Sequence, residues 1–184
     1  MALSAAWGNV VQELKKEGDG ALSDRVGPIS QFVERAAESQ ADKDYAADAM
    51  RIAEEIWNLA VANKRSQPDD GGDLTNISAE CEVRRAAITL FGAALPDDGT
   101  SGHEKIAAWT IDCSTRLIRG AKDCEAASDL LCRGAKYFGE GTSDSNVYFT
   151  SRLLFAELHF NNKQVRSRQI CVPSHTSRSH LTAS

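Results

Sequence analysis

Residues 106–138 carry the pattern that most narrows what this chain can fold into. Apolar side chains recur there every three or four residues, in two stretches that are each long enough for a helix. Such spacing places the apolar side chains along one face of an α-helix. Only residues 120–123 separate the two stretches, and so short a link makes two helices lie antiparallel. We therefore predict a helical hairpin with one stripe of Ile106, Trp109, Cys113 and Leu117, and a second of Cys124, Ala127, Leu131, Ala135 and Phe138.

The second helix of this hairpin resembles the second half of a tetratricopeptide repeat. The small Ala127 follows an acidic start at Asp123, and the large apolar Leu131 lies four residues further on. In that repeat a small residue lets two helices approach closely, and a large apolar residue fills the space beside it. Hairpins of this kind stack on their neighbours and offer another face to partner proteins. The resemblance implies an all-α fold of antiparallel, tetratricopeptide-like hairpins that form the start of an α-solenoid.

The N-terminal part of the chain is also predicted to be helical, and we find no convincing strand. Residues 1–40 are expected to form separate N-terminal helices, the first over 4–17. Pro28 is expected to lie in the first turn of the second helix, because proline is tolerated there. A third helix over 41–64 has a wide apolar face and is expected to be the most buried of the set. It opens the tetratricopeptide-like region, which we place at residues 41–160.

Two further helices are predicted from their start signals and their apolar spacing. Ser78 is expected to cap a fourth helix, with Glu80 and Glu82 in its first turn, where carboxylates favour the helix dipole. A seventh helix is expected to begin near Asp144, after a glycine-containing loop. Its inward residues are predicted to be Val147, Ser151, Leu154 and Leu158.

Composition and charge narrow the classes of partner. The net charge of −5 is spread along the chain, whereas phosphate binding needs clustered Lys and Arg, so no direct nucleic-acid partner is expected for the main body. No apolar run approaches the ~20 residues that span a bilayer, so no membrane partner is expected. Five cysteines form no Cys-x-x-Cys pair, and we expect reduced thiols, most of them buried in helices, with a disulfide or a zinc site as the alternative.

Residues 161–184 are predicted to be a disordered basic tail. From residue 165 onward they contain three arginines and two histidines, no acid, and no apolar repeat at helical spacing. A nucleic-acid-binding tail is the other interpretation. Three arginines can neutralise few phosphates, which favours the first.

The titratable residues do not fall into a spacing that builds an active site. Adjacent carboxylates such as Glu54 and Glu55 point about 100° apart on a helix. The four histidines show no metal-ligand spacing with cysteine or acid, and His103 is expected to lie exposed at a helix start. We therefore assign no catalytic, cofactor-binding or metal-binding residue and no cofactor, and expect a protein that is not an enzyme. The tryptophans are expected to anchor the core: Trp7, Trp57 and Trp109.

Three segments together resemble a known family. They are Ile56–Val61, with its Trp57-Asn58 pair, Val83–Leu90, and 126–135 at the end of the hairpin. Their succession is similar to the N-terminal region of the meiotic crossover scaffold family. That family includes the plant and fungal Zip-four proteins, the Spo-twenty-two proteins and the mammalian testis-expressed homologue. The similarity covers roughly residues 41–160, and Trp57-Asn58 is its sharpest element.

The resemblance implies a non-enzymatic protein-interaction scaffold in meiotic recombination, acting in crossover formation and chromosome synapsis. It implies a location in the nucleus on meiotic chromosomes, and partners among other meiotic crossover and chromosome-axis proteins, with no small-molecule substrate. Family members are far longer repeat arrays, so a chain of about one repeat and a half is expected to be a fragment, a truncated gene model or a short isoform. The alternatives are a generic helical adaptor unrelated to meiosis, and an enzyme or its accessory subunit. A cleft joining His103 or His159 to a low-pKa cysteine would favour the enzyme.

Overall fold

The computed structural model describes residues 3–16, 20–37, 44–65, 74–95, 102–138 and 150–161, and these parts of the chain contain helices and no strand. The all-α prediction is therefore confirmed for them. Residues 150–161 form a further helix. The other elements, in chain order, are α1 (Leu3–Lys16), α2 (Leu22–Ala37), α3 (Tyr45–Arg65), α4 (Leu74–Ala94), α5 (His103–Arg116), the π-helical turn η1 (Leu117–Ala121), α6 (Cys124–Gly134) and the 3-10 turn η2 (Ala135–Tyr137).

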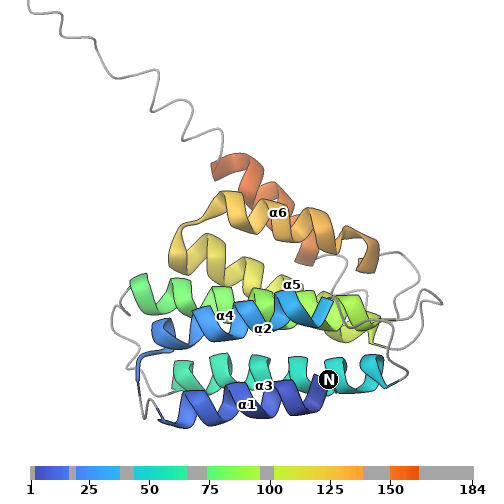
Figure 1. Ribbon diagram of the computed structural model, residues 1–184. Coiled ribbons are helices and arrows are strands. Elements are labelled where there is room, and N and C mark those ends of the chain that lie inside the picture. Colours follow the sequence, from blue (N-terminus) through green and yellow to red (C-terminus); the bar gives the residue numbers. More distant parts are fainter. Residues whose placement is uncertain are drawn as a thin grey trace, which may run out of the picture.

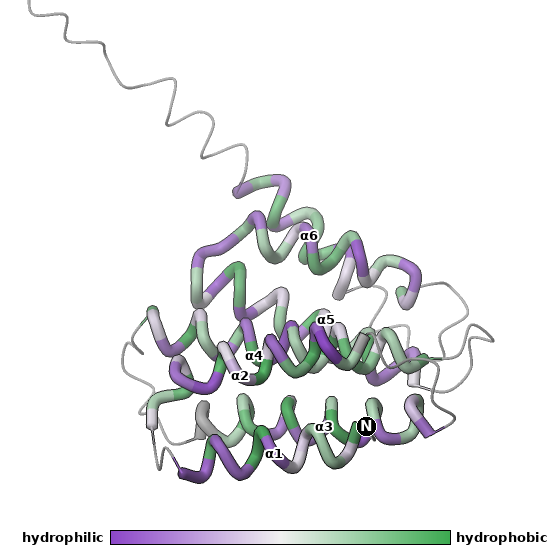
Figure 2. Tube along the Cα trace, in the orientation of Figure 1, coloured by the Kyte–Doolittle hydropathy of each residue, from purple (hydrophilic) through white to green (hydrophobic). Residues whose placement is uncertain are grey.

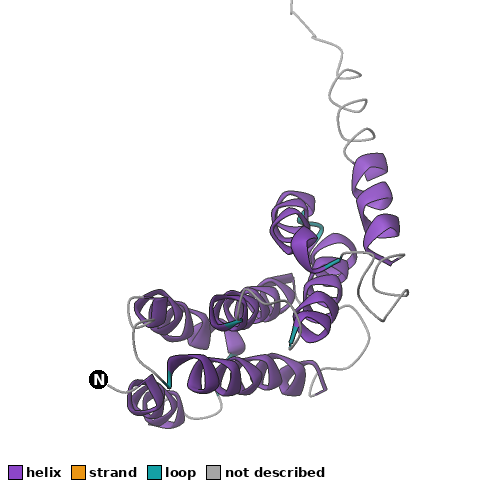
Figure 3. Ribbon diagram, turned by 90° about the vertical axis from the view of Figure 1, so that its right-hand side faces the viewer, coloured by secondary structure: helices purple, strands orange, loops and turns teal. Residues whose placement is uncertain are grey.

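Consecutive helices run antiparallel, so that α1 pairs with α2, α3 with α4, and α5 with α6 (Figure 1). The α3–α4 pair has the most extensive contacts of all, and α4 also packs against α2 and α5. Helix α1 contacts both α2 and α3. Seen after a quarter turn, the helices form a succession of pairs, with 150–161 at the end opposite the N-terminus (Figure 3).

Helix α4, and not α3, lies at the centre of the fold. The expectation that the third helix would be the most buried is wrong, because α4 has neighbours on three sides, in α2, α3 and α5. The outer helix α1 alternates between hydrophilic and hydrophobic residues, as an amphipathic helix does (Figure 2). By contrast, α4 buries a wide face, and its buried residues are Ala79, Glu80, Cys81, Val83, Arg84, Ala87, Ile88, Leu90, Phe91 and Ala94.

Two predicted helix starts lie too late in the sequence. Helix α2 begins at Leu22 and carries Pro28 in its interior, where proline removes one intrahelical hydrogen bond. The buried side chain of Leu22 holds the turns before the proline against the core. Helix α4 begins at Leu74, so Ser78 is not its N-cap. Glu80 then lies in the second turn and is buried instead of facing solvent.

The hairpin at 103–138 forms as predicted, with a shorter link. Only Lys122 and Asp123 lie outside helical turns. Lys122 adopts the left-handed conformation, with φ of 60°, which turns the chain back on itself. A carboxylate oxygen of Asp123 accepts a hydrogen bond from the backbone N–H of Ala126 at 2.9 Å, which caps α6. The cap and the left-handed residue together fix where the second helix starts.

The apolar stripe of α6 is rotated relative to the prediction. Ala127, Leu131 and Phe138 are buried as expected, but Ala135 is exposed. A four-residue step overshoots a helical turn by about 40°, so two such steps carry a residue away from the face. The buried face is completed by residues one position earlier, Leu130 and Gly134.

Gly134 marks the closest approach of α5 and α6. A Cβ atom added there would lie 2.7 Å from the Cγ2 atom of Thr110, which is fully buried. We therefore expect Gly134→Ala to lower the free energy of unfolding by about 1–3 kcal/mol, as overpacking does, although alanine is the better helix former. Urea unfolding of the full chain, followed by circular dichroism, measures the change.

The control is Gly8→Ala in α1, where nothing lies within 4 Å of an added Cβ atom. This variant should be more stable by about 0.5–1 kcal/mol, because only the backbone preference changes. Thr110→Ser removes the obstructing methyl group and should rescue part of the loss in Gly134→Ala. Equal effects of the two glycine substitutions would show that α5 and α6 are not in close contact at Gly134.

The helix at 150–161 packs its predicted face inward. Ser151, Leu154 and Leu158 are buried, and Arg119 Nη2 of η1 lies 2.9 Å from Glu157 Oε2. The predicted start at Asp144 and the inward position of Val147 lie outside the described residues, as does the predicted tail from residue 162 onward. Asn161, predicted to begin that tail, belongs to this helix instead. None of the described helices combines the length and apolar character that crossing a bilayer requires.

Candidate functional groove

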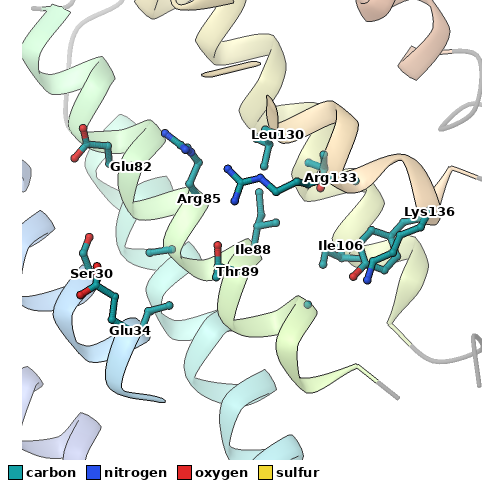
Figure 4. A pocket seen from close by; sticks show the side chains of 16 residues that line it. Ser30, Glu34, Glu82, Arg85, Ile88, Thr89, Ile106, Leu130, Arg133 and Lys136 are labelled. Atoms are coloured by element: carbon teal, nitrogen blue, oxygen red, sulfur yellow. The ribbon is translucent and has the colours of Figure 1, made fainter. Parts of the chain in front are cut away.

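The candidate functional site is an open groove of about 760 Å³, lined by residues of α2, α4, α5, α6 and η2. Its volume lies in the range of about 300–1,000 Å³ that is usual for ligand-binding pockets. We name it the α2–α6 groove (Figure 4). Its lining residues are Ser30, Val33, Glu34, Glu82, Arg85, Ala86, Ile88, Thr89, Gly92, Ile106, Thr110, Leu130, Arg133, Gly134, Lys136 and Tyr137.

The lining combines largely buried apolar side chains with exposed charged ones. Each contributing element supplies a buried apolar residue: Val33, Ile88, Ile106, Leu130 and Tyr137. These residues belong to the core, and the groove exposes only their outer edges. The shape of the lining is therefore set by the packing of the helices.

The charged side chains of the groove separate by sign. Glu34 of α2 and Glu82 of α4 lie on one side, and Arg133 of α6 and Lys136 of η2 lie on the other (Figure 4). Arg85 of α4 lies between them. Its Nη2 atom is 4.0 Å from Asp129 Oδ2, and Arg133 pairs with the same carboxylate oxygen. The groove thus has an acidic side and a basic side.

A buried network of charges joins α4 to α5 elsewhere in the fold. The carboxylate of Glu80 lies 2.7 Å from Arg84 Nη2 and accepts hydrogen bonds from Arg116 Nε at 3.2 Å and Nη2 at 2.9 Å. Arg84 also pairs with Asp112. Glu80 and Arg84 are each only 2% exposed. The hydrogen bond from Arg116 to Glu80 raises the pKa of the arginine above its usual value.

Two tryptophans extend this network into the core. The guanidinium of Arg84 lies over the ring of Trp57, 4.7 Å from its centroid, and Trp57 stacks on Trp109 with centroids 4.6 Å apart. Trp7 and Trp57 are buried, and Trp109 is partly buried against the core. The prediction that the tryptophans anchor the core is confirmed. The network was not predicted from the sequence, because Glu80 was expected in the first turn of a helix, where a carboxylate favours the helix dipole.

The cysteines divide by position. Cys81 and Cys113 are buried between α4 and α5, and the Cys113 thiol donates a hydrogen bond to the backbone carbonyl of Cys81 at 3.7 Å. Hydrogen bonding with the Cys113 side chain lowers the pKa of the Cys81 thiol. Hydrogen bonding with the Cys81 side chain, together with burial, raises the pKa of the Cys113 thiol. Cys132 is exposed, so the expectation of buried helical thiols is wrong there. Cys171 lies outside the described residues.

The remaining titratable residues are dispersed. His103, the first residue of α5, packs edge-on against Tyr137 with ring centroids 5.2 Å apart, and His159 is exposed on the helix at 150–161. Glu54 pairs with Lys105, and Glu55 accepts a hydrogen bond from the Trp7 indole at 2.6 Å. Within the parts of the chain that the structure describes, no three His, Cys, Asp or Glu side chains gather as a metal site would require.

These features define an all-α protein with a charged groove between its helix pairs. Comparison with known proteins gave no match, whether with protein-family models, curated proteins or solved structures.

Proposed function

We propose that this chain is a non-enzymatic protein-interaction scaffold, and that a partner protein binds in the α2–α6 groove. The observation that carries the proposal is the composition of the groove. Buried apolar side chains lie at its base and exposed charges lie at its edges. Protein interfaces share this arrangement, with an apolar centre inside a polar rim.

We further propose that the helix pairs are tetratricopeptide-like and form the start of an α-solenoid. The antiparallel pairing of consecutive helices supports this proposal. So do the close approach of α5 and α6 at Gly134 and the full burial of Ala127 and Leu131. In stacked-helix arrays partners bind on an extended surface to which successive repeats contribute. The α2–α6 groove is a surface of this kind, because α2, α4 and α6 come from three successive pairs.

The proposed process is meiotic recombination, with a location in the nucleus on meiotic chromosomes. Support comes from the resemblance of residues 41–160 to the meiotic crossover scaffold family, above all at Trp57-Asn58. The proposed partners are other crossover and chromosome-axis proteins. A helical adaptor unrelated to meiosis would use the same groove. Expression restricted to cells that enter meiosis would separate the two.

Deletion of the gene tests the proposed process. A null strain should form fewer crossovers and grow normally in vegetative culture, because the scaffold is required only when chromosomes recombine. Genetic map length across marked intervals and growth rate are the two measurements. Normal crossover numbers in the null strain, or poor growth before meiosis, would refute the meiotic assignment.

A further inference from the structure

The charges of the α2–α6 groove are largely unsatisfied by the residues that the structure describes. Among the described residues, neither Glu34 nor Glu82 forms an ion pair. On the other side are three cations, of which Arg85 and Arg133 share the single carboxylate of Asp129 and Lys136 lies over the ring of Tyr137. Two unpaired negative charges therefore face two net positive charges across an apolar base.

We propose that the groove binds an amphipathic helix of a partner protein whose two flanks carry opposite charge. Its apolar stripe would lie over Ile88 and Leu130, its acidic flank along Arg133 and Lys136, and its basic flank along Glu34 and Glu82. The inference rests on the proposed function, since it specifies the partner for the same groove. An amphipathic helix presents three or four apolar residues per two turns along one face. Such a face can lie in a groove formed between helices.

A helix fits better than an extended peptide. An extended peptide gains its affinity by adding a strand to an open sheet edge, and the described parts of the chain contain no sheet. A helix satisfies its own backbone, so it needs only apolar contact and charge complementarity from its partner.

The separation of charge also selects against uniformly charged partners. A phosphorylated or polyacidic segment would be attracted to Arg133 and Lys136 but repelled by Glu34 and Glu82. A uniformly basic segment would be attracted to Glu34 and Glu82 but repelled by Arg133 and Lys136. Like charges brought together at an interface oppose binding. The Asp129 carboxylate is about half exposed, as is Arg133, so an incoming carboxylate can replace it at little cost.

The test uses three fluorescein-labelled helical peptides of the same length with the same leucine stripe. The first has glutamates on one flank and lysines on the other, the second has lysines on both, and the third has glutamates on both. Fluorescence anisotropy with the full chain should show binding of the first peptide about tenfold tighter than of the other two. The preference should shrink as the salt concentration rises, because the charged residues are exposed.

Charge reversal in the protein should redirect the preference. Arg133→Glu with Lys136→Glu makes both sides acidic, so the lysine peptide should become the tightest ligand. Glu34→Lys with Glu82→Lys makes both sides basic and should favour the glutamate peptide. The control is Lys15→Glu with Lys16→Glu at the exposed end of α1. This variant has the same net charge as the first, and it should leave the order of the three peptide affinities unchanged.

The outcomes separate this inference from the proposed function. Equal binding of all three peptides would overturn the charge preference and leave a groove that binds helices. Tightest binding of the glutamate peptide, or of single-stranded DNA used as a further probe, would overturn the proposed partner class. Absence of binding by every peptide up to ~1 mM would overturn both the inference and the groove as the protein-binding site.

Discussion

Glu80→Gln should lower the free energy of unfolding by about 3–5 kcal/mol, the loss usual when one partner of a buried ion pair is removed. The carboxylate of Glu80 is in contact with two guanidinium groups, those of Arg84 and Arg116, and Glu80 is only 2% exposed. A neutral amide leaves the two arginines close together with Asp112 as the remaining acid. Urea unfolding of the full chain at neutral pH measures the loss.

The matched control is Glu157→Gln. Glu157 accepts hydrogen bonds from Nε and Nη2 of Arg119, the same two nitrogens that Arg116 presents to Glu80. The side chain of Arg119 is 64% exposed, so the pair contributes little, and its loss should change stability only slightly. Adding Arg84→Met to Glu80→Gln should recover part of the loss by removing a buried, undercompensated cation. Similar effects of the two glutamate substitutions would place Glu80 at the surface.

Leu131→Ala should lower the free energy of unfolding by about 2–5 kcal/mol, because a large buried side chain leaves a cavity that the helices close only in part. Leu131 is fully buried in α6, next to a residue that is already small, Ala127. Thermal or urea unfolding measures the change, and the helical content of the folded state should stay the same.

Leu153→Ala is the control for this substitution. Leu153 is 69% exposed on the helix at 150–161, so its truncation should cost less than about 0.5 kcal/mol. An effect of Leu131→Ala below about 0.5 kcal/mol would mean that Leu131 lies outside the core. The predicted stripe of the second hairpin helix would then be wrong.

Local sequence determined the helices and the hairpin. Three-to-four spacing placed Ile106, Cys113 and Leu117 on one buried face, because a helix repeats every 3.6 residues whatever surrounds it. Asp123 determined where α6 begins, since its side chain bonds a backbone N–H only three residues away. Two of the predictions that failed were Ala135 on the buried face, which extended the helical repeat too far, and Pro28 in a first helical turn, which used a local preference alone. Neighbouring elements decided those positions.

Only the tertiary structure decided which charges are buried and which form a site. Arg51 with Glu55 and Glu80 with Arg84 are the same kind of pair, four residues apart on a helix, yet the first is about half exposed and the second is almost fully buried. Sequence spacing cannot distinguish them, because burial depends on how many helices pack around the pair. The groove is equally nonlocal. Its two charged sides come from α2, α4, α6 and η2, and they face each other only because α4 packs between α2 and α5.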